Sequence, residues 1–152
     1  MINNLVIMIV TYKSYNIIQK TVKNIHNVGK IYVIENSNDI KFKNKLEKKF
    51  PNIECILTGK NLGFGNALNL VLKKINKNKI VMFLNPDCFI KAADVKKLHY
   101  LVSKNQFIGC LAPMSIDHKD RINVRYGYFA FSKKKKESEY NNLIQVDYVS
   151  GH

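Results

Sequence analysis

The stretch Ile80-Val81-Met82-Phe83-Leu84-Asn85-Pro86-Asp87 indicates the fold more clearly than any other part of the sequence. Its first five residues are apolar, as expected of a strand buried in a sheet, and its last three form a polar end stiffened by proline. Such a strand places Asp87 at the carboxyl edge of a sheet, where ligands bind in open α/β folds. A carboxylate there suits a divalent cation that holds a diphosphate. The alternative is a plain Pro-Asp turn, which is common after strands.

Strand-like apolar runs alternate with helix-like segments over most of the chain. Strands are predicted over residues 5–10, 30–34, 53–57, 80–84 and 108–111, and apolar residues recur at helical spacing within 17–25, 42–50, 67–75 and 95–102. This alternation predicts an α/β fold with a mainly parallel sheet and right-handed crossovers. After Pro113 the pattern changes, and short strands are predicted over 126–131 and 143–149 without helices between them. We therefore expect one α/β domain over residues 1–114 and an incomplete second region over 115–152.

The chain is strongly basic, with a formal net charge of +14 and a pI of about 9.7. Nearly all of this charge is Lys, which an AT-rich genome would favour, but it still attracts polyanions such as an anionic membrane surface, a nucleotide or a nucleic acid. The densest basic run is Lys133-Lys134-Lys135-Lys136. It is either a solvated loop or a membrane contact worth about 1 kcal/mol per Lys on an anionic leaflet.

Composition narrows the classes of protein. A hydrophobic content of 46% excludes wholesale disorder, and no apolar run reaches the ~18 residues of a membrane span. Residues 1–10 show no basic start and no cleavage site, so we expect a cytoplasmic protein, with peripheral contact at the inner face of the plasma membrane as an option. The three cysteines, Cys55, Cys88 and Cys110, form neither a zinc pattern nor a disulfide framework, and we expect reduced thiols in the core.

Polar segments follow each of the first four predicted strands. Because parallel strands end at one edge of a sheet, these segments are expected to converge into one cleft. The candidate ligand-binding residues are Thr11, Tyr12, Glu35, Asn36, Ser37, Asn61, Gly63, Phe64, Gly65, Asn69, Asn85 and Asp87.

Each segment also has an ordinary structural interpretation. The cluster from Glu35 to Asp39 either pairs with a base or ribose or forms a turn that caps the next helix. Gly63 and Gly65 either let a ligand approach the backbone at a helix N-terminus or form a tight turn. Asn69 is either a ligand contact or exposed. The four histidines are dispersed, and no Ser/His/Asp or Cys/His arrangement indicates a covalent hydrolase.

Four motifs together resemble the family 2 glycosyltransferases, and most closely the rhamnosyltransferase-like branch that builds bacterial surface polysaccharides. They are Val10-Thr11-Tyr12, Glu35-Asn36-Ser37, the segment Asn61-Leu62-Gly63-Phe64-Gly65-Asn66-Ala67-Leu68-Asn69, and Leu84-Asn85-Pro86-Asp87. Their order and spacing agree with the family over residues 5 to 114, and the segment 146–151 is similar to the family's next landmark. The resemblance implies a GT-A fold, a nucleotide-binding α/β sandwich with helices on both faces of the sheet.

The resemblance also implies an activity. Family members are inverting transferases that bind a sugar nucleotide with Mg²⁺ or Mn²⁺, and an acceptor hydroxyl attacks the anomeric carbon. Asp87 would ligate the metal beside Asn85, Glu35 would approach the base or ribose, and the remaining candidates would shape the pocket. Both UDP and dTDP donors fit, and the acceptor would be a saccharide or a lipid-linked saccharide. Residues 1–114 would be the donor-binding domain, and 115–152 the start of the acceptor side.

This chain departs from the family pattern in two places. The family usually has Asp where Glu35 stands, and its acidic general base lies beyond the last landmark, after the point at which this sequence ends. Asp117, Asp120 and Asp147 are not in the position of that base. We therefore expect an N-terminal donor-binding part, truncated at its C-terminal end, that binds nucleotide weakly and transfers sugar poorly by itself.

Three other interpretations stay open. A nucleotidyltransferase would carry a Gly-rich basic loop near the first strand, which Thr11-Tyr12-Lys13-Ser14 is not. A nucleic-acid-binding module suits the charge, but the aromatic residues are mostly embedded in apolar runs, so nucleic acid is the less favoured partner. The third is an inactive nucleotide-binding or scaffold subunit, for which self-association into a homo-oligomer is an option.

Overall fold

The structure, a computed structural model, describes residues 1–116, 119, 121–123, 126–127 and 148–149. The chain divides into two compact units, Met1–Ile108 and Gly109–His152. The predicted functional division at residue 114 stays a prediction.

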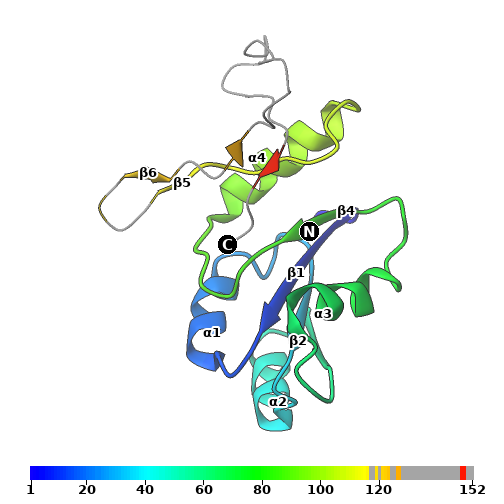
Figure 1. Ribbon diagram of the computed structural model, residues 1–152, viewed down its shortest axis with the longest axis vertical. Coiled ribbons are helices and arrows are strands. Elements are labelled where there is room, and N and C mark those ends of the chain that lie inside the picture. Colours follow the sequence, from blue (N-terminus) through cyan, green and yellow to red (C-terminus); the bar gives the residue numbers. More distant parts are fainter. Residues whose placement is uncertain (117–118, 120, 124–125, 128–147, 150–152) are drawn as a thin grey trace. The chain divides into compact units, whose positions relative to one another are not determined.

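The first unit alternates strands and helices around a four-stranded sheet (Figure 1). Its elements are β1 (Leu5–Thr11), α1 (Tyr15–Lys23), β2 (Lys30–Glu35), α2 (Ile40–Lys49), β3 (Ile53–Leu57), α3 (Gly63–Leu72), β4 (Ile80–Phe83) and α4 (Ala92–Lys104). The strand order is β3-β2-β1-β4, and every neighbouring pair is parallel. The α/β fold with a parallel sheet that the sequence predicts is confirmed.

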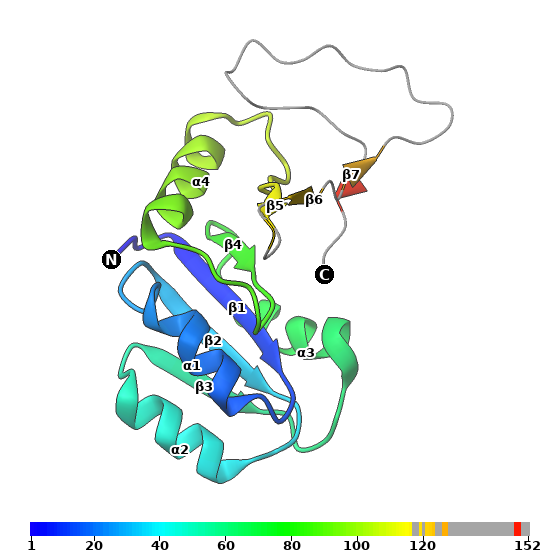
Figure 2. The same cartoon turned by 90° about the vertical axis from the view of Figure 1, so that its left-hand side faces the viewer.

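Helices cover both faces of this sheet (Figure 2). Every residue of β1 is buried, and alternate side chains of the strand enter two separate apolar clusters. Ile7 and Ile9 pack with α1, α2 and α4, whereas Met8 and Val10 pack with α3. A continuous apolar run such as residues 5–10 is what a strand buried on both faces requires.

Three sequence positions at or near the ends of helices have local structural roles. Asp39 caps α2, because its Oδ1 accepts a hydrogen bond from the Phe42 N–H at 2.9 Å. The chain turns after α1 and reaches Gly29, where an added Cβ would lie 2.8 Å from the carbonyl oxygen of Leu5. Helix α3 begins at Gly63, so Gly63 and Gly65 lie in the first turn of a helix rather than in a separate tight turn.

The strand predicted over 108–111 is wrong. The chain turns after α4, where the N–H of Ile108 bonds the carbonyl of Asn105 at 3.1 Å, and Gly109 and Cys110 are exposed. Four apolar residues in sequence do not make a strand when no neighbouring strand pairs with them.

The second unit contains two short antiparallel strand pairs among its described residues. β5 (Ser115–Ile116) pairs with β6 (Ile122–Asn123), and β7 (Tyr126–Gly127) pairs with β8 (Tyr148–Val149). The predicted strands over 126–131 and 143–149 agree with β7 and β8 where they overlap. Outside the described residues lie the rest of both predicted strands, Lys133–Lys136, Asp117, His118, Asp120, Asp147 and His152.

The expectation of three core thiols holds only for Cys55. Cys55 is buried in β3, whereas Cys88 and Cys110 are exposed because each lies in a loop rather than in a strand. Across the part of the chain that the structure describes, no helix is long and apolar enough to cross a membrane.

Candidate functional site

The candidate site lies at the carboxyl ends of the strands of the first unit, where the loops leading to the helices begin. Thr11, the last residue of β1, is in register with Glu35, the last residue of β2. The N–H of Asn36 bonds the carbonyl oxygen of Thr11 at 2.9 Å. The convergence that the sequence predicts for these two loops is therefore present in the backbone itself.

Glu35 is completely buried. Its Oε1 accepts hydrogen bonds from the backbone N–H of Ser37, at 2.6 Å, and from the Ser37 hydroxyl. Its backbone carbonyl accepts from both the N–H and the hydroxyl of Thr58, each at 3.2 Å. These contacts fix the carboxyl group in place and tie the end of β2 to the end of β3.

Two buried oxygens at this edge have no hydrogen-bond partner among the described residues. They are the second carboxyl oxygen of Glu35, Oε2, and the hydroxyl of Thr11. Because the two residues are in register on adjacent parallel strands, their side chains lie on the same face of the sheet. A buried polar atom without a partner costs about 1–3 kcal/mol, so both oxygens keep an unused capacity for hydrogen bonds.

Asn36 joins the second loop to the third. It is 3% exposed, its Nδ2 donates to the carbonyl of Gly63 at 3.1 Å, and its Oδ1 accepts from the N–H of Leu62 at 3.2 Å. Asn61 supports the same turn, since its Oδ1 accepts from the N–H of Gly63 at 2.9 Å. Gly63 has a φ of +73°, which favours glycine. Asn36 thus positions the start of α3, a role that sequence reasoning did not assign to it.

Other predicted residues of these loops are open to solvent. Tyr12 and Phe64 are large exposed side chains, at 48% and 51% exposure. Gly65 and Asn69, both on α3, are also exposed. They are accessible to a ligand.

The fourth loop, which follows β4, carries the predicted metal ligand. The N–H of Leu84 bonds the carbonyl of Met8 at 3.0 Å, so the pairing of β4 with β1 extends one residue beyond the strand. Asn85 is half-buried and Asp87 is exposed. The hydroxyl of Thr21, a fully buried residue of α1, donates to the carbonyl of Pro86 and anchors the loop.

Sequence reasoning missed Thr21 and Thr58. Thr21 lies on the inward face of a helix whose neighbouring inward residues are apolar, and a polar residue at such a position is the available signal. Thr58 follows β3 directly, but nothing in its local sequence separates it from an ordinary loop residue.

Asp87 can hold a cation only together with other ligands. The described residues contain no cluster of three or more His, Cys, Asp or Glu that could hold a metal ion by itself. Mg²⁺ commonly binds through one or two carboxylates while phosphates and waters complete its shell. The exposed carboxylate of Asp87 therefore fits a cation that arrives with a diphosphate, and does not fit a resident ion held by protein groups alone.

Cys88 follows Asp87 directly, and its residue as a whole is exposed. Partial burial of the thiol raises the pKa of Cys88, and the negative charge of Asp87 raises it further. The free thiol is therefore neutral at physiological pH.

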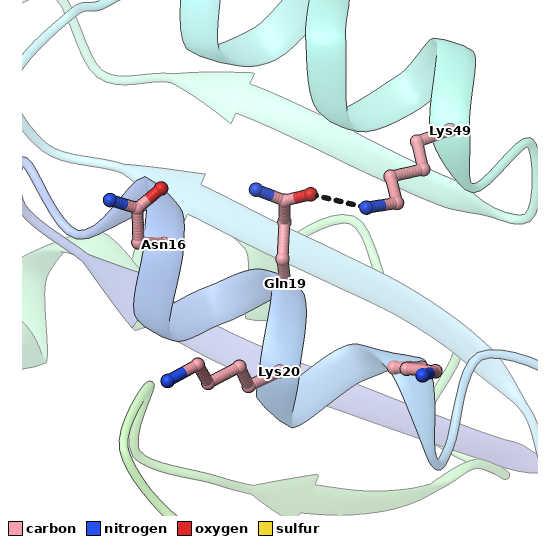
Figure 3. Close-up of a pocket in the computed structure, with 5 residues that line it drawn as sticks. Asn16, Gln19, Lys20 and Lys49 are labelled. Atoms are coloured by element: carbon pink, nitrogen blue, oxygen red, sulfur yellow. Dashed lines mark hydrogen bonds between the residues drawn. The ribbon is translucent and has the colours of Figure 1, made fainter.

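A hollow lies elsewhere, on the outer surface of α1 and α2 (Figure 3). Its volume is about 460 Å³, and it is lined by Asn16, Gln19, Lys20, Lys23 and Lys49. Lys49 Nζ donates to Gln19 Oε1 at 2.6 Å across it. None of these residues is among the predicted site residues.

Comparison with solved structures supports the fold. The chain is similar to the crystal structure of S. aureus TarS, with a TM-score of 0.57 and 16% identity over 74% of this chain. The structure of TarS 1–349 in complex with UDP-GlcNAc gives a TM-score of 0.56 and 17% identity over 74% of this chain. The chain spans 24% of the longer and 38% of the shorter of these two TarS chains. The GT-A type fold is thereby confirmed.

Comparison by sequence gives the family. No curated protein matches the sequence. The description of the matching family is "Glycosyl transferase family 2", and the match extends over residues 6–150, which is nearly the whole sequence. The chain therefore belongs to glycosyl transferase family 2.

Proposed function

We propose that this chain binds the donor of an inverting glycosyltransferase, a sugar linked to a nucleoside diphosphate. The observation that carries the proposal is the group of polar side chains at the carboxyl ends of adjacent parallel strands. At this edge the buried oxygens of Thr11 and Glu35 have no described partner. Family membership supports the reaction class.

Each loop has a proposed part in donor binding. Glu35 Oε2 would accept a hydrogen bond from the base or ribose, and the Thr11 hydroxyl would donate or accept beside it. Tyr12 and Phe64 offer exposed rings on which a base can stack. Asn36 and Ser37 would hold the pocket wall, together with Asn61, Gly63, Gly65 and Asn69 at the start of α3.

The fourth loop would hold the diphosphate. Asp87 would ligate Mg²⁺ or Mn²⁺, with Asn85 beside it and Thr21 fixing the loop through the carbonyl of Pro86. A cation bound there neutralises the charge that develops on the leaving diphosphate as the glycosidic bond breaks. The acceptor hydroxyl would attack the anomeric carbon from the opposite side of the sugar, which inverts the configuration.

The donor is proposed to be a UDP- or dTDP-sugar. TarS has been solved with UDP-GlcNAc and with UDP, which supports a uridine donor. A carboxyl oxygen such as Glu35 Oε2 pairs with an imide N–H or a ribose hydroxyl, and both uracil and thymine carry the imide. The acceptor would be a saccharide or a lipid-linked saccharide in bacterial surface polysaccharide synthesis, at the cytoplasmic side, and the rhamnosyltransferase-like branch stays a prediction.

Calorimetric titration with UDP and dTDP, with and without Mn²⁺, tests the donor site. We expect binding that needs Mn²⁺ and that weakens about 10- to 100-fold in Asp87→Ala. The matched control is Asp94→Ala, which removes another exposed carboxylate, from the first turn of α4, and should leave binding unchanged. Glu35→Gln should also weaken the Mn²⁺-dependent binding, because it changes the base or ribose contact.

Two results would contradict the proposal. One is UDP affinity that does not respond to Mn²⁺ or to Asp87→Ala. The other is a salt-sensitive affinity for DNA or RNA that added UDP does not compete with, which would favour a nucleic-acid-binding module instead.

A further inference from the structure

Helices α1 and α2 form a strongly basic surface on one face of the sheet. Together they carry seven lysines and a single acidic residue, Glu47. Glu47 is matched by Lys43, whose Nζ lies 2.8 Å from its Oε1. The six other lysines are exposed, and we call them the α1–α2 basic face: Lys20, Lys23, Lys41, Lys45, Lys48 and Lys49.

The opposite face of the sheet is covered by α3, which contains no charged residue, and exposed lysines begin again after its end, at Lys73 and Lys74. Figure 2 shows α1 and α2 side by side on one face and α3 on the other. The charge of the described helices is therefore concentrated on one side of the unit.

Two of the lysines bridge the helices and keep the basic face continuous. Lys45 Nζ lies 5.9 Å from the ring centroid of Tyr15, and Lys49 donates to Gln19 at 2.6 Å. Lys20, Lys23, Lys41 and Lys48 form no ion pair with any described residue. Four ammonium groups thus have no ion-pair partner among the described residues, which favours their contact with an external anion.

The side chains of this face favour some anionic partners over others. It has no Arg, whose planar fork reads phosphates in a specific geometry. Its two aromatic residues are not available for stacking on bases, since Phe42 is buried and Tyr15 packs edge-on against it at 5.3 Å. Exposed aliphatic side chains do lie in the first turns of the two helices, Ile17 at 43% and Ile40 at 61% exposure.

We propose that the α1–α2 basic face binds the surface of an anionic phospholipid bilayer. Lysines suit a diffuse layer of phosphate headgroups, because they act as point charges on long flexible stems. The two exposed isoleucines add apolar groups that can enter the interface between headgroups and acyl chains. The assignment does not depend on donor binding, which occurs at the carboxyl ends of the strands.

Flotation with lipid vesicles tests this assignment. At ~0.1 M salt the full chain should bind vesicles of phosphatidylcholine mixed with phosphatidylglycerol, should ignore pure phosphatidylcholine, and should be released by high salt. The variant Lys20→Gln/Lys23→Gln/Lys48→Gln should lose about 100-fold in vesicle affinity, at about 5-fold per lysine. These three positions leave the bridges from Lys45 and Lys49 intact.

The matched control removes the same charge from another place. Lys73→Gln/Lys74→Gln/Lys77→Gln changes three exposed lysines that follow α3, and it should retain most of the vesicle affinity. UDP titration and circular dichroism of both variants should match the parent chain, which separates this test from that of the donor site.

Three outcomes would overturn the assignment. They are failure of the parent chain to bind anionic vesicles, equal losses in the two triple variants, and tighter binding to duplex DNA than to vesicles with the same dependence on Lys20, Lys23 and Lys48. Equal losses would mean that vesicles respond only to net charge.

Discussion

The two ends of the parallel sheet in the first unit are built from different groups. At the amino end, apolar side chains such as Ile25, Val28 and Phe50 are buried against the strands, and the N–H of Ile2 bonds the carbonyl of Val28 at 2.7 Å. At the carboxyl end the buried residues include Thr11, Glu35 and Asn36, and this end holds both buried oxygens that have no described partner.

Backbone conformation follows the same division. Within residues 1–116, the residues in the left-handed region are Lys13, Asn38, Gly59 and Gly63. The first three lie in loops that follow strands, and Gly63 is the first residue of α3. Left-handed φ costs of order 1 kcal/mol or more for a residue that is not glycine. The amino end contributes stability, whereas the carboxyl end retains strained backbone and unpaired polar groups, as binding sites commonly do.

The largest effect of a single substitution is expected at the amino end, for Gly29→Ala. The new Cβ would meet the carbonyl oxygen of Leu5 at 2.8 Å, and a backbone atom in a central strand cannot easily move away. Overpacking of this kind costs about 1–3 kcal/mol. Urea unfolding should show that loss in stability, while the UDP affinity of the folded protein stays unchanged.

Gly109→Ala is the control, because its Cβ would meet nothing within 4 Å. It should leave the free energy of unfolding within about 0.5 kcal/mol of that of the parent chain. If Gly29→Ala also leaves the midpoint unchanged, or abolishes UDP binding by folded protein, the contrast between the two ends does not hold.

Two buried threonines give a matched pair of smaller effects. Thr21→Val removes the hydrogen bond to Pro86 and leaves its carbonyl unpaired, so it should destabilise the protein by about 1–2 kcal/mol. Thr11→Val replaces a buried hydroxyl that has no described partner by a methyl group of similar size. It should therefore stabilise the protein by about 1 kcal/mol.

Unfolding and UDP titration of both variants check this pair. Thr11→Val should gain stability and lose nucleotide affinity, which is the behaviour of a group kept for binding. A loss of stability in Thr11→Val would mean that its hydroxyl is satisfied inside the protein, and the argument for a ligand at this oxygen would fail.

Sequence patterns were sufficient for the regular part of the fold and for most of the loops. The run of residues 5–10 predicted a strand buried on both faces because burial on two sides requires a continuous apolar run. The positions of Thr11, Glu35 and Asn85 followed from one rule, that parallel strands end at a common edge. The strand over 108–111 failed because pairing depends on a neighbouring strand, which a local pattern does not report.

Long-range hydrogen bonds were not predictable in the same way. Asn36 binds Leu62 and Gly63, and Thr21 binds Pro86, at separations of 26, 27 and 65 residues. The side-chain type allows such contacts but does not select the partner. The interpretation of Asp39 as a helix cap is confirmed by its hydrogen bond from Phe42. This contact was predictable because the two residues are only three positions apart.

The smallest effect on stability is expected for a substitution of Glu47, in the last turn of α2. Burial acts to raise its pKa, but hydrogen bonds from Lys43 and from the N–H of Cys55 outweigh burial, and the pKa is lowered. A pKa lowered in the folded state stabilises the protein above the unfolded value of about 4.3, and that stability is lost as the pH falls through the folded value.

Thermal unfolding from pH 7 to pH 3 should therefore show a slightly smaller acid loss of stability in Glu47→Gln than in the parent chain. The matched control is Glu54→Gln, which removes a more exposed carboxylate paired with Lys30 at 3.0 Å and should change the pH dependence less. Neither variant touches the carboxyl-end loops, so UDP affinity at pH 7 should be the same in both. A change in UDP affinity with Glu47→Gln would show that the last turn of α2 and the donor loops are coupled, and that the two ends of the sheet do not act independently.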